Sequence, residues 1–562
     1  MTQLQAIARF WDVELTSNRQ RDVVAQLAEA MTAPKTITDA YSALPDDQRQ
    51  ALDALLAAGG RMPLRVFARQ WGEIRTMGPG RLDRKRPWQE PTSPAEGLWY
   101  KGFVSRAFNP EAKETYEIIF VPPELHAHLP APPAPPPIIT LEPAPEPTTV
   151  RSAGATLLDD ACTLLAYLQN EQLRPRPDGN WPARHEARLA QRLYDPSPAR
   201  LTLLRHLSQR LGWLRVTDSV LLRPDPGPVA AWLQSSTSQQ RAALVKAWRD
   251  DPTWNDLFHV PTLHSEDTGA WRNDPLLARK AILHHLKTRA PNAWYKLDDF
   301  IVAIKQTTPD FQRPGGDYTT WYIRDAVTGA YLSGFESWDK VEGALIRHLI
   351  TGPLAWLGLV ALGAADSDKS PTTFRLAPAG TIFLGLTEPP SAAEPAALTL
   401  RPDFTVLVPP ARRYERFQLA RIADWVASPL SGGIEGGDFV YRVTPTSLKR
   451  ARRQGIPIAR VLEFIGQVTD APVPRFVEAA LTRWDARGAE VRLEQVLLLR
   501  LSNEELMTQI TSSPRTRRLI HEQIGPTTAL VREHDWPRLV VALGEMGFLA
   551  DIVALGKKTG TS

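Results

Sequence analysis

Apolar and polar positions near the N-terminus follow the pattern of three helices and then two short strands. LPDDQRQALDALLAAGG (44–60) begins with acidic residues and ends in Gly-Gly, which are typical helix start and stop signals. PLRVFARQWG (63–72) and SPAEGLWYKG (93–102) each carry Pro near the start, where a helix tolerates it. GFVSRAF and TYEIIFVPPEL then alternate with period two around a polar turn, which predicts a β-hairpin.

The same order recurs in three later segments, 203–227, 348–380 and 438–451. Their last strands end alike (VLLRPDPG, FRLAPAG and YRVTPTS), and in each a proline can open the next helix. Helices followed by a hairpin are the order of a winged-helix unit. The repetition predicts a mainly α protein with small β-hairpins, of the α+β class, built from tandem winged-helix-like units.

The last part of the chain differs from these repeats. LTLRPDFTVLVPP (398–410) predicts a buried strand, and RYERFQLARIADWVAS (413–428) predicts a helix. IPIARVLEFIGQV (456–468) and VPRFVEAALTRWDARG (473–488) both have helical apolar spacing. A strand–helix alternation closes the chain, so we expect a compact α+β domain here.

Proline clusters mark the expected domain boundaries. LPAPPAPPPIITLEPAPEP (129–147) predicts an extended, semi-rigid linker, and SAAEPA (391–396) a second, weaker joint. The expected domains are 1–128 (winged-helix-like), 129–150 (Pro-rich linker), 151–234 and 235–390 (two further winged-helix-like units), 391–556 (α+β) and 557–562 (tail).

Composition narrows the class of protein. The 562 residues carry a net charge of only +4, so a nucleic-acid partner would need local basic patches. The single cysteine, Cys162, excludes an intrachain disulfide and a cysteine-based zinc site, and suits a reducing cytoplasm. Its apolar surroundings favour a core position over a nucleophile. No apolar run reaches the length of a membrane span, so we expect no membrane association.

Motifs for catalysis or cofactors are missing from the sequence. There is no G-x-S-x-G nucleophile elbow, no G-x-x-x-x-G-K-[ST] phosphate loop and no acidic metal box. Two histidine groups lack metal-ligand spacing: His259 and His264 with Asp256, and His284 and His285 with Asp274. We therefore expect no bound metal, no cofactor and no enzymatic activity from this chain alone.

TPTSLKRARRQG (444–455) carries four basic residues within five positions and no acid. Thr444 is a good N-cap, and Gly455 supplies a C-terminal stop, so a helix is expected between them. Its basic residues fit either a solvated helix face or contacts to the phosphates of nucleic acid. Other basic residues lie where winged-helix units would present them. The candidate nucleic-acid-binding residues are Arg442, Lys449, Arg450, Arg452, Arg453, Arg412, Arg413, Arg81, Arg84, Lys85, Arg86, Lys101 and Arg106.

Several of these stretches share a family resemblance. LRPDFTVLVPP, YRVTPTSLKRARRQG, VLEFI…PVPRFVEAAL and TTALVREHDWPRLVVALGEMGFL together resemble the N-terminal, helicase-associated domain of XPB-type DNA repair helicases, in a long bacterial form. DYTTWYIRDAVTGAYLSGFESWDKVEGALIRHLITGPLAWLGLV (317–360) is similar to the matching region of long bacterial relatives. Such helicases continue into an ATPase motor, and from the resemblance we expect this chain to end where that motor would begin. The resemblance thus implies a domain without its motor.

Two functions remain open from the sequence. The first is a non-catalytic DNA-binding or helicase-accessory protein that contacts the phosphate backbone. The alternative is a protein-interaction scaffold that recruits or regulates a separate helicase or ATPase. Aromatic side chains beside basic ones could stack on bases, although large rings also fill the cores of small helical domains.

Overall fold

A computed structural model of the protein has the expected α+β class, with many helices and small antiparallel sheets. The structure describes residues 2–109, 115–131, 141–151, 154–265, 271, 273–366, 370–389, 395–429, 437–488, 490–491 and 496–552. Parts of the Pro-rich linker (132–140), of SAAEPA (391–394) and the whole tail (557–562) lie outside these residues. Met1–Ala451 with Ile465–Ala471 form one compact unit, and Arg452–Phe464 with Pro472–Ser562 form another.

The N-terminal region combines a helical bundle with a three-stranded sheet of order β1-β3-β2. Its elements are α1 (Thr2–Phe10), α2 (Gln20–Met31), α3 (Pro34–Ser42), α4 (Asp46–Ala57), β1 (Arg61–Pro63), α5 (Leu64–Trp71), α6 (Pro79–Lys85), α7 (Pro94–Tyr100), β2 (Ser105–Phe108), β3 (Glu117–Phe120) and α8 (Pro123–His126). Leu52, Phe67, Leu98 and Ile119 belong to its core. The three helices α4, α5 and α7 and the hairpin confirm the sequence prediction, whereas α1–α3 and α6 were not expected.

The middle region repeats this strand order in a larger sheet, β4-β10-β11-β8. Its elements are β4 (Thr149–Arg151), α9 (Thr156–Asn170), α10 (Ala183–Ala190), α11 (Pro198–Arg210), β5 (Leu214–Val216), β6 (Leu222–Pro224), α12 (Pro226–Leu233), α13 (Thr237–Arg249), η1 (Asp256–His259), β7 (Leu263–Ser265), α14 (Pro275–Lys287), β8 (Tyr295–Lys296), α15 (Leu297–Thr307), β9 (Ile323–Asp325), η2 (Phe335–Ser337), η3 (Asp339–Gly343), α16 (Ala344–Leu349), η4 (Ile350–Leu354), β10 (Val360–Ala364), β11 (Thr373–Leu376) and α17 (Pro378–Phe383). In both sheets the last strand lies between two earlier ones: β3 lies between β1 and β2, and β11 lies between β8 and β10.

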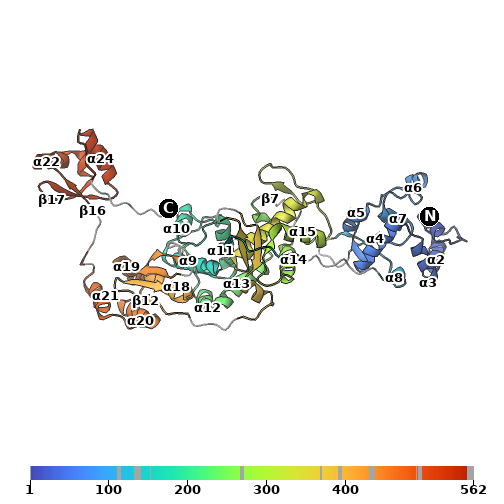
Figure 1. The fold of residues 1–562 in the computed structure, drawn as a ribbon, viewed down its shortest axis with the longest axis horizontal. Helices are drawn as coiled ribbons and strands as arrows, with labels where there is room; N and C mark the ends of the chain where they lie inside the picture. The colour runs from blue at the N-terminus through green and yellow to red at the C-terminus, as the bar shows by residue number, and fades with distance from the viewer. Residues whose placement is uncertain are drawn as a thin grey trace. The chain divides into compact units, whose positions relative to one another are not determined.

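The next segment forms a four-stranded antiparallel sheet of order β12-β13-β15-β14. Its elements are β12 (Thr399–Leu400), β13 (Thr405–Val408), α18 (Arg413–Ile422), β14 (Asp424–Ala427), β15 (Phe439–Arg442), α19 (Pro445–Arg453), α20 (Ile458–Val468) and α21 (Arg475–Arg487). The helix expected over 413–428 was too long, because 424–427 pair with β15 instead. Helix α18 packs beside α9, so segments far apart in the sequence share one core (Figure 1).

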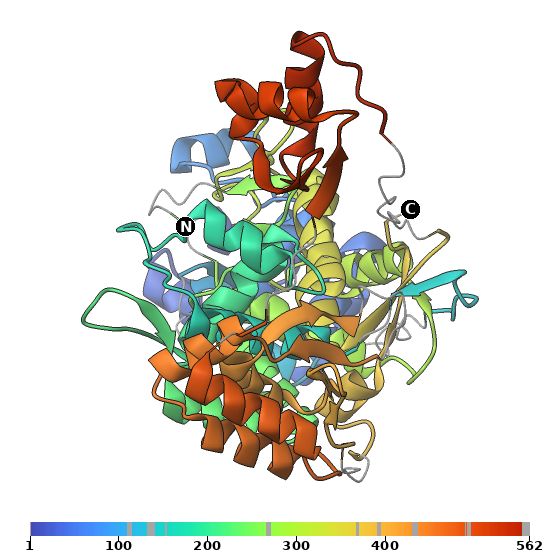
Figure 2. The same cartoon turned by 90° about the vertical axis from the view of Figure 1, so that its left-hand side faces the viewer.

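The C-terminal segment is a small sheet with helices against it, drawn in red in Figure 2. Its elements are β16 (Val496–Arg500), α22 (Glu504–Ser512), α23 (Pro514–Arg517), β17 (Ile520–Gly525), β18 (Thr528–Arg532) and α24 (Trp536–Glu545). Ile510, Val531, Leu539 and Leu543 form its core. Across the described ranges, no helix is both long and apolar enough to cross a bilayer.

Candidate nucleic-acid interface

Helix α19 is built as its sequence predicts. The Thr444 hydroxyl accepts a hydrogen bond from the Ser447 backbone N–H at 3.0 Å, which caps the helix start. Leu448 and Ala451, three residues apart, are buried on one side. Gly455 follows the helix with φ 75°, a left-handed conformation that favours glycine. The basic side chains therefore occupy the rest of the helix circumference.

Lys449 and Arg453 are the two basic side chains of α19 that are available to bind a phosphate. Both are exposed, and neither forms an ion pair or hydrogen bond with any residue that the structure describes. Residues four apart lie on the same face of a helix, so the two charges reinforce each other locally. Two adjacent cations without a carboxylate partner would attract a phosphate backbone.

Three further basic residues already have partners: Arg450 and Arg452 of α19, and Arg442 at the end of β15. Arg450 donates to the Asp424 carboxylate at 2.7 Å and to the Ala423 carbonyl at 2.9 Å, which ties α19 to the end of α18. Arg452 lies 3.8 Å from Asp485, and Arg442 lies 3.5 Å from Asp403. The last two pairs are exposed and weak, so a phosphate can compete for those arginines, whereas Arg450 has a structural role as well.

The prediction that Arg413 contacts nucleic acid is wrong. Its side chain is buried, with Nε 2.8 Å from the Asp159 carboxylate and a nitrogen 3.1 Å from Gln240 Oε1. A guanidinium enclosed in this way cannot reach a DNA phosphate. Neighbouring Arg412 is partly exposed but is paired with Glu415 at 3.2 Å and donates to two backbone carbonyls. Sequence reasoning missed Asp159, although two adjacent aspartates inside the apolar stretch LLDDACTLLAYL do signal a buried charge.

Helix α6 gives the N-terminal region an exposed basic surface. The side chains of Arg81, Arg84, Lys85 and Arg86 are all exposed. Arg84 Nε donates to the Gly80 carbonyl at 3.0 Å within the same helix. The structure therefore brings these four candidates together, three on α6 and Arg86 directly after it.

The side chains of Lys101 and Arg106 are less accessible to a phosphate than the basic side chains of α6. Lys101 Nζ donates to Gln48 Oε1 at 2.8 Å and lies 4.7 Å from the centre of the Phe10 ring. Its burial lowers the pKa of the Lys101 ammonium. Arg106 stacks over the Trp99 ring at 4.7 Å, so both cations cover aromatic surface.

Helix α7 is not exposed in the way that a DNA-reading helix would be. It is the last of the three helices that the sequence predicted before the hairpin, which is where a winged-helix unit would carry its DNA-reading helix. Ala95, Glu96, Leu98 and Tyr100 are buried, and α1, α4 and α5 pack against it. Glu96 forms a 2.7 Å ion pair with Arg75. Any DNA contact in this region would therefore come from α6 rather than α7.

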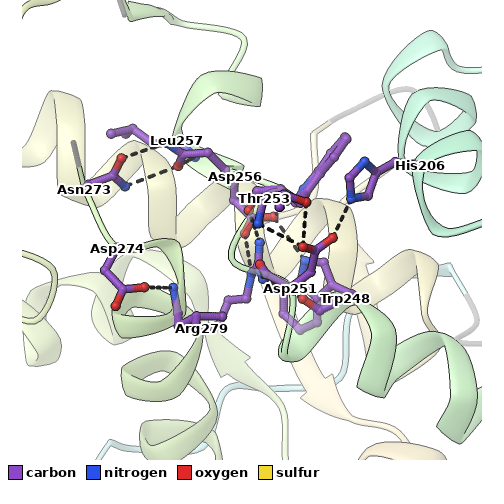
Figure 3. Close-up of polar contacts among 12 residues, drawn as sticks. His206, Trp248, Asp251, Thr253, Asp256, Leu257, Asn273, Asp274 and Arg279 are labelled. Atoms are coloured by element: carbon purple, nitrogen blue, oxygen red, sulfur yellow. Dashed lines mark hydrogen bonds and ion pairs between the residues drawn. The ribbon is translucent and has the colours of Figure 1, made fainter. Parts of the chain in front are cut away.

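The groups considered as metal ligands have other roles (Figure 3). The Asp256 carboxylate accepts hydrogen bonds from Arg279 at 2.7 Å and from the indoles of Trp248 and Trp254. His259 stacks on Trp254 with ring centres 3.8 Å apart. The described residues contain no group of three or more His, Cys, Asp or Glu side chains that could hold a metal ion. The Asp256 carboxylate thus holds Arg279 of α14 against Trp248 of α13 and Trp254.

Asp274 and His206 also take part in local structure (Figure 3). Asp274 caps α14 by accepting from the Leu276 N–H at 2.9 Å. His206 Nε2 lies 2.5 Å from Asp251, whose other oxygen is held by Thr253. These contacts fasten loops to helices.

Residues 398–525 match the family model described as "Helicase conserved C-terminal domain". No curated protein matches the chain. The matched segment contains α19 and covers less than half of the sequence. Its description names a C-terminal helicase domain, whereas the sequence resemblance pointed to the N-terminal domain of XPB-type helicases. The shared conclusion is that 398–525 is a helicase-related segment.

Proposed function

We propose that the protein is a non-catalytic DNA-binding or helicase-accessory protein that contacts the phosphate backbone mainly through α19. The observation that carries the proposal is the unpaired Lys449–Arg453 face, which lies inside the helicase-related segment. Arg442 and Arg452 extend the basic surface through exposed, exchangeable pairs. Such contacts supply affinity and salt dependence but little sequence information.

The proposal also includes the finer architecture and its domain boundaries. The repeated strand order of β1-β3-β2 and β8-β11-β10, each with helices before the last two strands, supports winged-helix-like units within 1–128 and 235–390. We further propose an XPB-N-terminal-like domain at 391–556 and a separate ATPase as the natural partner. A role beside a DNA repair helicase would fit this set of domains.

The decisive experiment compares DNA binding by the full chain and a Lys449→Glu, Arg453→Glu variant. Fluorescence anisotropy across a salt series would measure affinity for labelled duplex, single-stranded and forked DNA. Removing two phosphate contacts should reduce the slope of log K against log salt by about 2 and weaken binding at low salt. Arg450 is left unchanged because its loss would disturb α18.

A matched control uses Lys280→Glu and Lys287→Glu on α14. Both lysines are exposed and have no ion-pair partner in the described part of the chain. The control variant makes the same charge change away from α19 and should keep most of the affinity and the wild-type salt slope. If both variants lost the same DNA affinity, the loss would come from the change in net charge, and the assignment of the binding site to α19 would fail.

A scaffold is the second candidate, favoured by one observation in the C-terminal sheet. Leu498 is 46 % exposed on β16 and lies directly opposite Leu530 of β18. Contiguous exposed apolar patches mark surfaces that bind other proteins, and this pair would form the centre of such a patch. If the wild-type chain binds none of the three DNA forms at low salt, the scaffold function replaces DNA binding.

A further inference from the structure

A cavity of about 250 Å³ lies beside α19, next to the side chain of Arg450. Its walls come from α9, α18, β14, β15 and α19, with Arg192 added from the loop after α10. Three aromatic rings line it, those of Tyr167, Trp425 and Tyr441. The wall thus combines a cation with ring surfaces, next to the basic helix already described.

Three side chains of this cavity have nitrogen donors without an acceptor among the described residues. The Arg192 guanidinium lies 5.4 Å from the Tyr167 ring centre and 5.8 Å from that of Trp425, and has no carboxylate partner among the described residues. The Trp425 indole N–H and Arg450 Nε are buried without a hydrogen-bond partner in the same set of residues. Buried N–H groups normally have a partner, so the wall is short of acceptors.

The two carboxylates of the cavity do not supply them. Glu171 is paired with Arg188 at 2.6 Å, and Asp424 is held by Arg450 and by the Thr444 hydroxyl at 2.6 Å. The remaining N–H groups call for a ligand with several oxygen acceptors, and the unpaired charge of Arg192 favours an anionic one. A phosphate group meets it, since guanidinium groups bind phosphate oxygens strongly.

We infer that this cavity binds the phosphate of an unpaired nucleotide in a DNA strand that runs along α19. The inference rests on the proposed DNA contact through α19 and adds a preference for single-stranded or unpaired DNA. Arg192 and Arg450 face the phosphate, and the rings of Trp425 and Tyr441 give the base an apolar surface. A base pair held in a stacked duplex is too large for a cavity of about 250 Å³, whereas a single extruded nucleotide is small enough to enter it.

The test measures the affinity of the full chain for fluorescein-labelled oligothymidylate and for a blunt duplex of equal length. Arg192→Ala should weaken oligothymidylate binding about tenfold and duplex binding by less than about twofold. Arg192→Lys keeps the charge and should recover a large part of the loss. Near-ultraviolet circular dichroism checks that both variants keep the wild-type fold.

A matched control and a direct contact map accompany this comparison. Arg174→Ala removes an exposed arginine that does not line the cavity, and it should change neither affinity. Photocrosslinking with oligothymidylate that contains 5-iododeoxyuridine should label Tyr167, Trp425 or Tyr441 in the wild type. Loss of this labelling in Arg192→Ala would support the cavity as the binding site.

The outcomes separate this inference from the proposed function. If DNA binding depends on Lys449 and Arg453 but not on Arg192, the cavity inference fails and the proposed function stands. If the chain binds no DNA, calorimetry with thymidine monophosphate decides: binding that Arg192→Ala abolishes supports the nucleotide cavity, and no binding overturns it. Inorganic phosphate that binds as tightly as the nucleotide would show a simple anion site, which also overturns it.

Discussion

The guanidinium of Arg413 lies 2.8 Å from the carboxylate of Asp159, although 254 positions separate the two residues in sequence. Both side chains are almost fully enclosed, and Arg416 donates to the Asp159 backbone carbonyl at 2.6 Å. This pair joins α18 of the helicase-related segment to α9. The segment therefore shares its core with residues far outside the matched range.

Arg413→Ala should strongly destabilise the fold. The variant leaves the buried Asp159 carboxylate with Arg416, 3.8 Å away, as its remaining ion-pair partner, and breaking a buried pair typically costs about 3–5 kcal/mol of unfolding free energy. Arg412→Ala is the adjacent control, for which a loss of about 1 kcal/mol or less is expected from a partly exposed pair. Urea denaturation followed by circular dichroism measures both. Similar midpoints for the two variants would show that the buried pair contributes little.

His348 should make stability depend on pH below neutrality. Its burial lowers the pKa to about 4 from the usual 6.5, so the unfolded chain binds a proton there before the folded chain does. This contribution to stability is fully present above pH 6.5 and is lost as the pH falls towards 4. Urea midpoints at several pH values would measure it, and His348→Gln should have a shallower pH dependence than the wild type. Parallel curves for the two proteins would contradict this prediction.

Cys162 should be unreactive until the chain unfolds. Its side chain is fully buried, Sγ lies 3.3 Å from the Arg413 carbonyl, and burial raises the pKa of the thiol. Because the thiolate is the reactive form, a disulfide-exchange reagent should release almost no product from native protein. The same reagent in concentrated urea should report one thiol, since the chain has one cysteine. Rapid native reaction would mean that the contact between α9 and α18 opens readily.

Local signals in the sequence predicted the elements whose ends are capped. Thr444 and Gly455 set the ends of the basic helix, and the acidic start and Gly-Gly end placed α4 correctly. Helix α2 was missed because only Val23 and Leu27 are buried along it, which leaves little apolar periodicity to detect. The helix predicted over 413–428 was too long. The apolar positions near its end fit the spacing of a helix as well as that of a strand, and only the pairing with β15 shows that 424–427 form a strand.

The candidate site was less predictable than the fold. Arg412 and Arg413 are adjacent in sequence, yet Arg412 caps the start of α18 and is partly exposed, whereas Arg413 is its first residue and is buried against α9. A count of basic residues cannot reveal a carboxylate that arrives from a distant segment. The same limit hid the cavity, because Arg192, Tyr167 and Trp425 come together only through the packing of α9 against α18.

The short strand β4 has a consequence for contacts between separate copies of the chain. It pairs with β10, a strand whose five residues Val360–Ala364 are all buried. Without β4, the backbone groups along that side of β10 would form a template for adding a strand from another molecule. The three residues of β4, Thr149–Arg151, cover this edge of β10 with a short strand that ends in a charged arginine. Short, charged edge strands disfavour pairing with another chain, so we expect β4 to protect the sheet against self-association.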